Sequence, residues 1–365
     1  MAGAIQRTLS AWALGLTAGL SLGFVMGGYW FRRRPPEEAQ PPRPPPEESP
    51  PSGAFFAERL DVSTSLRGNI HTHSLESDGD RPPEEVFAWY RDHGYAFVAL
   101  TDHNKRIDPS SYRHLERPGF VIIPGEEITM TVGGAPVHVN AICTKSTIGG
   151  GAMPSRAEAL SSAIQKVREQ DGAALINHPN FEWALSARDL PSGRGAPLLE
   201  IWSGHPFVRT EGDQDHKSHE ALWDEALLGG EHFAGVAVDD MHHLAPDAPD
   251  PASRPGRGFI EVFAREASEP AVCEALRSGR LYASMGAAIK RIVIDFNAFS
   301  LWPGAADAKV EFIGAGGEIL ASSAEGQDAG GARTYRLRGD ERYVRARVTQ
   351  ADGKKAWTQA HRIAR

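Results

Sequence analysis

Between residues 60 and 288, short runs of apolar residues alternate with stretches in which apolar residues recur at helical spacing. Short apolar runs are typical of buried strands, and the helical spacing is typical of helices that cover them. Alternation at this density predicts a largely parallel sheet, and about seven strand–helix units favour a distorted barrel over an open sheet. The predicted strands are GNIHTH, FVALTDH, VIIPGEEI, PVHVNAI, ALINHP, LLEIWSG and FAGVAVDDMH.

Start and stop signals flank two of the helical stretches. Pro82 and Pro83 precede two glutamates, and Gly94 follows twelve positions after the first proline, which predicts a helix between them. Ser155 and Glu158 have the spacing of a capping box, in which each side chain accepts a hydrogen bond from the other residue's backbone N–H. We therefore expect a second helix to begin after Ser155.

The pattern changes over residues 289–365. From Val344 to Val348 apolar and polar residues alternate strictly, and Asp352-Gly353 is a hairpin turn signal. This part of the chain predicts a small all-β domain of the sandwich type, separate from the α/β domain over residues 60–288.

Residues 1–34 predict a membrane anchor with a basic flank. The segment 8–31 carries no charge over 24 residues, which is enough for a helix to cross a hydrocarbon core of roughly 30 Å. We favour a retained anchor over a cleaved signal peptide because the apolar run is longer than a usual signal-peptide core. Residues 35–59, rich in proline, predict an extended linker.

Glycines recur every four residues within the apolar segment and therefore share one helix face. Small residues on one face let two membrane helices approach closely, which predicts a homodimer, although glycine is also simply common in membrane helices. These residues are Gly15, Gly19, Gly23 and Gly27. The three arginines that follow the segment, residues 32–34, place the downstream domain in the cytoplasm by the positive-inside rule.

The composition of the 365-residue chain excludes several function classes. A net charge of −8 argues against nucleic acid as a partner, because phosphate-backbone binders carry an excess of Lys and Arg. Two cysteines, Cys143 and Cys273, are too few for a disulfide-rich fold or a cysteine-ligated zinc fold, and they leave the redox compartment open. The 14 histidines indicate that any metal site uses nitrogen and oxygen ligands.

Two histidine motifs lie at the ends of predicted strands. His71 and His73 form a His-x-His pair, and Asp240 and His242 repeat the same spacing. Side chains at i and i+2 of a strand point to the same face, so each pair can reach one ion. A single pair of this kind is more often incidental than a site.

Further ionisable residues end the other predicted strands. His103 follows Asp102, and strand alternation lets only one of the two face the interior; we expect His103 to do so. Alternation does not choose between Glu126 and Glu127. Taken singly, His138 reads as a core histidine, His178 as a turn residue before proline, and Asp78 as a turn residue. Together, so many buried ionisable groups are costly without a metal, which predicts a polynuclear metal site.

These motifs resemble, in order and spacing, those of the PHP (polymerase and histidinol phosphatase) family of metallohydrolases, over about half of the chain. The sequence after these motifs is similar to the branch of the family related to carbaryl hydrolase. It consists of the segment GFIEVFAREASEPAVCEALRSGRLYAS and the β-rich C-terminal region. The resemblance implies a distorted seven-stranded β/α barrel with two or three divalent ions, Zn, Mn or Fe. It implies these ligands: His71, His73, Glu127 and Asp240 at one ion; Glu127, His138 and His178 at a second; Asp78, His103 and His242 at a third.

The resemblance further implies a metal-dependent hydrolase, in the first place a phosphoesterase, that uses a hydroxide bridging the ions. Asp240, His242 and His178 would act in catalysis as well as in metal binding. Expected substrate contacts are Lys105, Arg106, Asn180, His205 and His243, whereas we take His216 and His219 for surface residues. An amide or carbamate hydrolase of the carbaryl type is the first alternative. A membrane-tethered binding protein with a structural metal site is the second.

Overall fold

The computed structural model describes residues 58–61, 64–322 and 331–363, all within the unit Pro50–Arg365. The predicted anchor over residues 8–31, its glycine face and most of the predicted linker lie outside the described residues. Among the residues that are described, no helix combines the length and the apolarity needed to cross a bilayer. The linker ends earlier than expected, because Glu58 already belongs to a strand.

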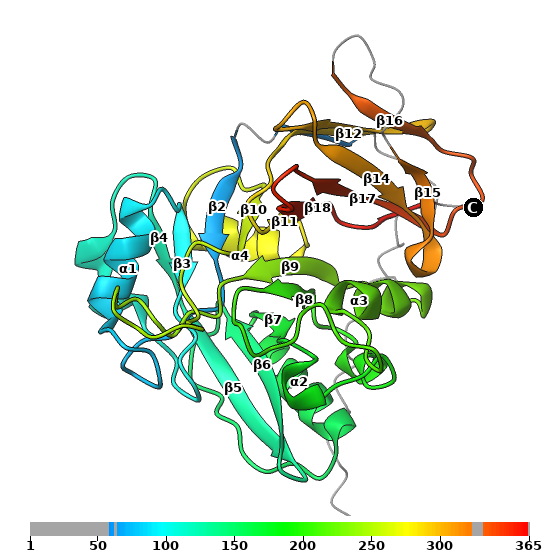
Figure 1. Cartoon of the computed structure of the whole chain (residues 1–365). Helices are drawn as coiled ribbons and strands as arrows, with labels where there is room; N and C mark the ends of the chain where they lie inside the picture. Colours follow the sequence, from blue (N-terminus) through cyan, green and yellow to red (C-terminus); the bar gives the residue numbers. More distant parts are fainter. Residues whose placement is uncertain (1–57, 62–63, 323–330, 364–365) are drawn as a thin grey trace, which may run out of the picture. The chain divides into compact units, whose positions relative to one another are not determined.

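The predicted α/β region contains a sheet of five described strands (Figure 1). Its order is β5 (Gly125–Val132), β6 (Ala135–Ile142), β7 (Ala173–Ile176), β8 (Leu198–Ser203) and β9 (Ala234–Val238). The chain reverses between β5 and β6 at Gly133 and Gly134, whose φ angles of +59° and +90° are easily adopted only by glycine. This hairpin makes β5 and β6 antiparallel, which the expectation of strand–helix alternation did not include.

A second sheet, of ten strands within the described ranges, runs from the α/β region into the C-terminal region. Its order is β15 (Ile319–Ser322), β14 (Lys309–Ile313), β17 (Tyr343–Thr349), β18 (Lys355–Trp357), β11 (Leu281–Ser284), β10 (Phe259–Val262), β2 (Leu66–Asn69), β3 (Phe97–Ala99) and β4 (Val121–Ile123), with β19 (His361–Arg362) paired to β17. Ala283 of β11 pairs with Trp357 of β18, so the sheet continues across residue 288, the predicted domain boundary.

The third sheet covers the C-terminal end of the second. Its order is β1 (Glu58–Asp61), β12 (Ile289–Ile294), β13 (Ala298–Pro303) and β16 (Arg333–Arg336). Phe299 of β13 meets Phe312 of β14 with ring centroids 5.5 Å apart, and both side chains are buried. The C-terminal region is therefore two layers of sheet around an apolar core.

Parallel and antiparallel strands are mixed in the α/β region. β2, β3 and β4 are parallel, as are β7, β8 and β9, whereas β2 and β10 are antiparallel. Two isolated parallel bridges, Thr72 with Met241 and His103 with Glu127, join the two large sheets. The fold is thus mixed α/β, and hydrogen bonding among the described strands does not close them into one continuous barrel.

Helices cover the sheets. Two of them lie where the start signals in the sequence predicted helices. Ser155 accepts a hydrogen bond from the backbone N–H of Glu158 (3.2 Å), which is one half of the predicted capping box, and its hydroxyl donates to the Glu158 carboxylate (3.1 Å). The α-helices are α1 (Pro83–Asp92), α2 (Arg156–Glu169), α3 (His219–Leu228) and α4 (Glu269–Arg277). Short 3₁₀ helices are η2 (Pro109–Ser111), η3 (Arg113–Leu115), η4 (Phe181–Trp183), η5 (Leu190–Gly193) and η6 (Ala315–Gly317).

A disulfide joins Cys143, directly after β6, to Cys273 in α4, with the two Cα atoms 6.0 Å apart. It links positions 130 residues apart in the sequence and ties α4 to the five-stranded sheet. The sequence left the state of these cysteines open.

Candidate metal centre

The nine residues expected to hold metal come together in one cluster: Glu127 and His138 lie within β5 and β6, and the other seven follow β2, β3, β7 or β9. Their donor atoms form four overlapping groups, each with all atoms within 4.8 Å of one another. The groups are His73–Asp78–His103–His242, His71–His73–Asp240, His71–Glu127–His178 and His103–Glu127–His138. The grouping differs from the expected sets in that His73 also belongs with Asp78, and His103 also lies within reach of Glu127.

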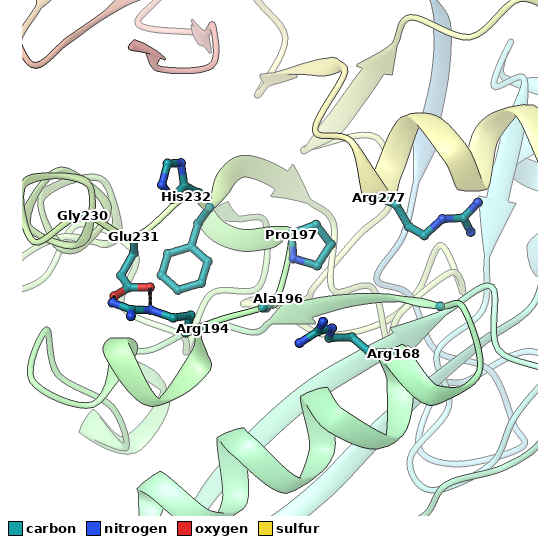
Figure 2. Close-up of a pocket in the computed structure, with 11 residues that line it drawn as sticks. Arg168, Arg194, Ala196, Pro197, Gly230, Glu231, His232 and Arg277 are labelled. Carbon is teal, nitrogen blue, oxygen red and sulfur yellow. Dashed lines mark hydrogen bonds and ion pairs between the residues drawn. The ribbon is translucent and has the colours of Figure 1, made fainter. Parts of the chain in front are cut away.

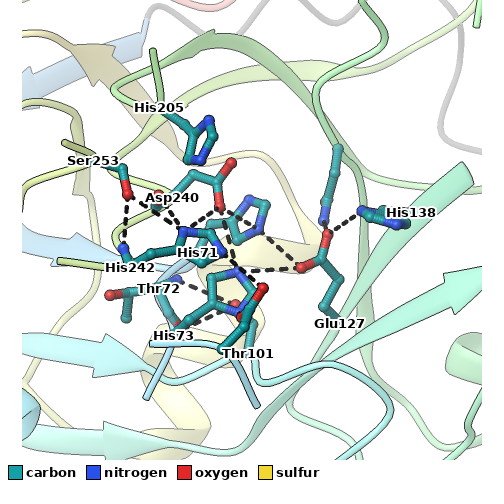
Figure 3. A network of polar contacts seen from close by, with 12 residues as sticks. His71, Thr72, His73, Thr101, Glu127, His138, His205, Asp240, His242 and Ser253 are labelled. Carbon is teal, nitrogen blue, oxygen red and sulfur yellow. Dashed lines mark hydrogen bonds and ion pairs between the residues drawn. The ribbon is translucent and has the colours of Figure 1, made fainter. Parts of the chain in front are cut away.

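The centre of the cluster consists of two imidazoles between two carboxylates (Figure 3). The Nε2 atom of His71 lies 3.3 Å from Glu127 Oε2 and 3.2 Å from Asp240 Oδ1. The Nε2 atom of His73 lies 3.2 Å and 3.3 Å from the same two oxygens. All four residues are buried. The His-x-His spacing therefore brings both rings to one point, as the sequence predicted.

Glu127 connects this centre to a second pair of imidazoles. Its other oxygen, Oε1, lies 2.9 Å from His138 Nδ1 and 3.4 Å from His178 Nε2. Glu126 points the other way and accepts hydrogen bonds from the backbone N–H groups of Ile148 and Gly149. The structure thus settles which of the two neighbouring glutamates faces the cluster.

Asp78 completes the solvent side of the cluster. Its Oδ2 atom lies 3.4 Å from His103 Nε2 and 3.3 Å from His242 Nε2, and its Oδ1 atom lies 3.4 Å from His73 Nδ1. The Asp78 side chain is 50% exposed, in contrast to the buried centre. Solvent can therefore reach this end of the cluster.

The donor set fits divalent ions. Two buried ring nitrogens, His73 Nε2 and His138 Nδ1, lie within 3.3 Å of carboxylate oxygens but form no aligned hydrogen bond with any described residue. Buried lone pairs without a hydrogen bond are costly, and metal ions that bind these nitrogens and the carboxylates would remove that cost. Imidazole and carboxylate donors without thiolate suit Zn, Mn or Fe.

The protonation of the cluster follows from its charges. Burial alone would raise the pKa of Glu127, but the imidazoles of His71 and His138 outweigh it and hold that pKa well below the usual range. The pKa of Asp240 is likewise lowered, against burial, by His71 and His73. Both carboxylates are therefore ionised and can serve as ligands at neutral pH.

Several buried residues orient the cluster and were missed or left undefined by the sequence. Glu200 Oε2 lies 3.2 Å from His71 Nδ1, on the opposite side of the ring from the cluster. Asn177 donates from Nδ2 to Glu127 Oε1 (2.8 Å). Asp102 accepts hydrogen bonds from the Ser74 backbone N–H and hydroxyl (both 2.8 Å), which holds the chain just after His73. A charged residue within the apolar run LLEIWSG was the only sequence signal for Glu200.

The expected substrate contacts fall into two groups. His205 and His243 line the cavity of about 230 Å³ over the cluster, with Phe181 and Val208 beside them. Lys105 instead forms an ion pair with Glu76. Lys105, Arg106 and Asn180 do not belong to the lining of this cavity.

Arg106 donates from Nε to the carbonyl of Thr144 (2.7 Å) and so turns away from the cavity. Asn180 is buried and donates from Nδ2 to the carbonyls of Arg209 and Lys217. Its role is in holding the loop after His178. The sequence could not show this, because these partners are distant along the chain.

The two histidines expected at the surface, His216 and His219, differ in burial. His216 is exposed, and its Nδ1 lies 2.7 Å from Asp213. His219 is fully buried, so the expectation of a surface residue was wrong. Burial lowers the pKa of His219 to about 3, and the nearby His178 imidazole adds to the effect.

A larger cavity, of about 680 Å³, lies away from this cluster, beside the N-terminal ends of β7 and β8 (Figure 2). Arg168 and Arg194 border it, and Arg194 forms an ion pair of 2.7 Å with Glu231. None of the candidate metal groups found in the described residues includes a residue of this cavity. The candidate metal-binding residues other than His71 line the smaller cavity.

No family model and no curated protein match this chain. Among solved structures it is similar to a two-domain protein from Bacteroides vulgatus containing a predicted PHP-like metal-dependent phosphoesterase, with 15% identity, a TM-score of 0.46, and 84% of this chain and 98% of that chain covered. A candidate metal-dependent phosphoesterase from Bifidobacterium adolescentis shares 15% identity (TM-score 0.37; 51% and 91% covered). An amidohydrolase from Chromobacterium violaceum, solved with sulfate and no metal, shares 16% (TM-score 0.35; 50% and 89% covered).

Proposed function

We propose that this chain is a metal-dependent hydrolase of the PHP type that cleaves phosphoesters. The observation that carries the proposal is one cluster of nine nitrogen- and oxygen-donor residues that includes Glu127, whose two carboxylate oxygens face different imidazoles. A carboxylate in this position can bridge two ions, and a cluster that connects buried and solvent-facing donors supports a catalytic rather than a purely structural site.

Three sets of donors would hold the ions. The first set is His71, His73, Glu127 and Asp240. The second is Glu127 with His138 and His178, and the third is Asp78 with His103 and His242. Divalent ions at these positions, Zn, Mn or Fe, lower the pKa of bound water and stabilise negative charge on the leaving oxygen. In this proposal Asp240, His242 and His178 act in catalysis through the same contacts.

The charge of the cluster favours an anionic substrate. Three carboxylates, on Asp78, Glu127 and Asp240, face six imidazoles. Three divalent ions would carry a charge of +6 against −4 from these carboxylates and Glu200, so a site loaded with three ions would be positive overall. A phosphoester is attracted to such a site, whereas a neutral amide or carbamate is not.

His205 supplies a hydrogen-bond donor in the cavity. Its Nδ1 accepts a hydrogen bond from the Phe207 backbone N–H (3.3 Å), so the ring proton is on Nε2. Burial also lowers the pKa of His205 to about 4, which keeps the ring neutral. His205 belongs to none of the candidate metal groups, so its Nε2–H is available to an oxygen of the substrate.

The test is turnover by the purified full-length chain with added Mn²⁺ or Zn²⁺. Aryl phosphomonoester, phosphodiester and carbamate substrates are compared, with His73→Ala as the inactive control. We expect phosphoester hydrolysis that His73→Ala abolishes. Carbamate hydrolysis alone would establish the first alternative, and metal binding without any turnover would establish the binding protein.

The arrangement of the rest of the chain is also a proposal. Residues 8–31 anchor the protein in a bilayer, the glycine face pairs two copies, and the linker before β1 holds the catalytic domain away from the membrane. Closure of the strands into a distorted barrel is supported by the contacts of β9 with β10 and β11 and by the bridge from Thr72 to Met241.

A further inference from the structure

His219 connects the metal cluster to the C-terminal sheets. It is the first residue of α3 and is fully buried. Its Nε2 atom accepts a hydrogen bond from the backbone N–H of Asn180 (3.2 Å), two residues after His178. Because Nε2 is the acceptor, the ring proton is on Nδ1. The ring therefore holds the backbone of the loop that carries His178.

The same loop is fixed at two more points. The side chain of Asn180 donates to the carbonyls of Arg209 (3.1 Å) and Lys217 (2.9 Å), both in the segment that leads into α3. Phe181 then packs against the rings of His178 and His138, with centroids 5.3 Å and 6.1 Å away. A displacement of α3 would thus move His178 relative to Glu127.

Buried ion pairs attach α3 to the C-terminal sheets. Arg345, which is 1% exposed, donates to both oxygens of Asp224 (2.8 and 2.6 Å) and lies 2.8 Å from Glu220. Arg347 lies 2.9 Å from Glu220 and 2.8 Å from Glu311 of β14. Figure 1 shows α3 between β8 and these C-terminal strands.

Apolar packing alone would leave α3 freer to shift. Its other face packs on the core of the α/β region through Leu222 and Trp223, whereas its charged residues Glu220 and Asp224 pair with arginines of β17. Buried pairs of this geometry fix one register, since any shift would leave a charge unpaired in a dry environment. The position of α3 is therefore set from the C-terminal side.

We propose that the C-terminal sheets position the metal ligand His178, acting through α3 and the positioning residue His219. The inference rests on the proposed metal centre. It assigns the C-terminal region a part in the site formed by Glu127, His138 and His178. The set around Asp78, held by other loops, is independent of it.

The test measures divalent-ion binding by the full-length chain, with Mn²⁺ as the probe. His219→Leu removes the acceptor, and we expect about 10- to 100-fold weaker binding of one ion, with the others unchanged. His219→Gln places an amide oxygen near the former Nε2 and should restore most of the affinity. If His219 only stabilised the fold, the two variants would bind Mn²⁺ equally well whenever they are equally stable. Their unfolding curves show whether they are equally stable.

Double variants identify the ion that is affected. If His219 acts on the site of His138, then adding His219→Leu to His138→Ala costs little further affinity, whereas adding it to His242→Ala gives the sum of both losses. Additive losses with His138→Ala would overturn the inference.

Arg347→Met tests the C-terminal side. Its side chain is 23% exposed, and its removal leaves Glu220 paired with Arg345 and Glu311 paired with Lys309, so the chain can still fold. We expect about 2- to 30-fold weaker binding of the same ion. Arg338→Met, at the exposed Asp340 pair, is the matched control.

Wild-type affinity in both His219→Leu and Arg347→Met, or an equal loss in Arg338→Met, would refute the inference. If the wild-type chain binds no divalent ion, the proposed function fails along with it. If the expected losses of Mn²⁺ affinity are found but no substrate is hydrolysed, the inference holds and only the proposed function fails.

Discussion

The Oε2 atom of Glu200 lies 3.2 Å from the Nδ1 atom of His71, and both side chains are fully buried. A carboxylate in this position accepts the Nδ1–H proton and leaves the lone pair of Nε2 free for a metal ion. The other oxygen of Glu200 has no hydrogen-bond partner among the described residues. The pair thus orients the central imidazole of the cluster.

We expect Glu200→Gln to weaken divalent-ion binding about 10- to 100-fold, because the neutral amide no longer raises the basicity of His71. The affinity is measured by competition with a chelator. Glu261→Gln is the control, since Glu261 is also a buried carboxylate but pairs with Arg67 of β2 and contacts none of the described residues of the cluster. Equal affinities in Glu200→Gln and the wild type would contradict this role.

His205 tests the phosphoester proposal at the level of a single hydrogen bond. Removing one donor to a developing negative charge commonly costs a factor of about 100 in rate. We expect His205→Ala to lower kcat by roughly that factor with unchanged metal content, because His205 lies outside the donor groups. His205→Gln keeps an N–H donor and should recover part of the rate. Loss of metal from His205→Ala would instead mean that His205 is a ligand.

A pH-dependent contribution to stability is expected from Glu341 in the C-terminal region. Burial raises the pKa of Glu341, but hydrogen bonds from the Tyr335 hydroxyl and from the backbone N–H groups of Arg338 and Gly339 outweigh it and lower the pKa to about 2. A carboxyl group whose pKa falls on folding stabilises the fold above its ordinary pKa. The contribution, at most about 3 kcal/mol, is lost as the pH falls from 4.5 towards 2.

Glu341→Gln should therefore make the unfolding free energy less dependent on pH between 4.5 and 2. The measurement is thermal unfolding followed by circular dichroism at a series of pH values. Asp340→Asn, at a neighbouring exposed carboxylate, serves as the control and should keep the wild-type slope. A Glu341→Gln profile parallel to that of the wild type would show that these hydrogen bonds do not stabilise the fold.

Part of the metal cluster could be predicted from short-range rules, whereas Asp78, Glu127 and His138 were expected as ligands only from the resemblance to a known family. Ionisable residues at strand ends meet at one edge of a sheet, and alternation places His71 and His73 on one face. The choice of Glu127 over Glu126 could not be made in this way. It depends on the loop at Ile148, whose backbone N–H donates a hydrogen bond to Glu126, so that Glu127 is the glutamate that faces the cluster.

The arrangement of the strands was harder to predict than their existence. The segments around β5 and β6 were both expected as strands, but the two-glycine turn between them makes a hairpin rather than a crossover. The pairing of β11 with β18 was also out of reach, because it joins residues more than seventy positions apart. Local apolar patterns carry no information on such pairings.

The positioning residues escaped prediction for a related reason. His219 looks polar and helical in sequence, and only the tertiary contact with Asn180 makes it a buried acceptor. Glu200 lies in an apolar strand, where a charged residue is a signal, but its partner His71 lies 129 positions away. The paired candidate ligands followed from spacing and the others from the resemblance, whereas the residues that orient them could be recognised only from tertiary contacts.

The last prediction concerns the side of the membrane. The basic residues 32–34 favour a cytoplasmic domain, but the disulfide between Cys143 and Cys273 favours an oxidising compartment, where structural disulfides persist. The arginine excess is small beside a short N-terminal tail, whereas structural disulfides are rare in a reducing cytosol. We therefore expect the catalytic domain on the oxidising side, so that external protease removes it from intact cells. Protection from the protease, together with free thiols at both cysteines in rapidly alkylated cell extracts, would place the domain in the cytoplasm instead. Cys273→Ser separates the two effects, because it should lower the unfolding temperature of a protein that is oxidised in the cell and leave that of a reduced protein nearly unchanged.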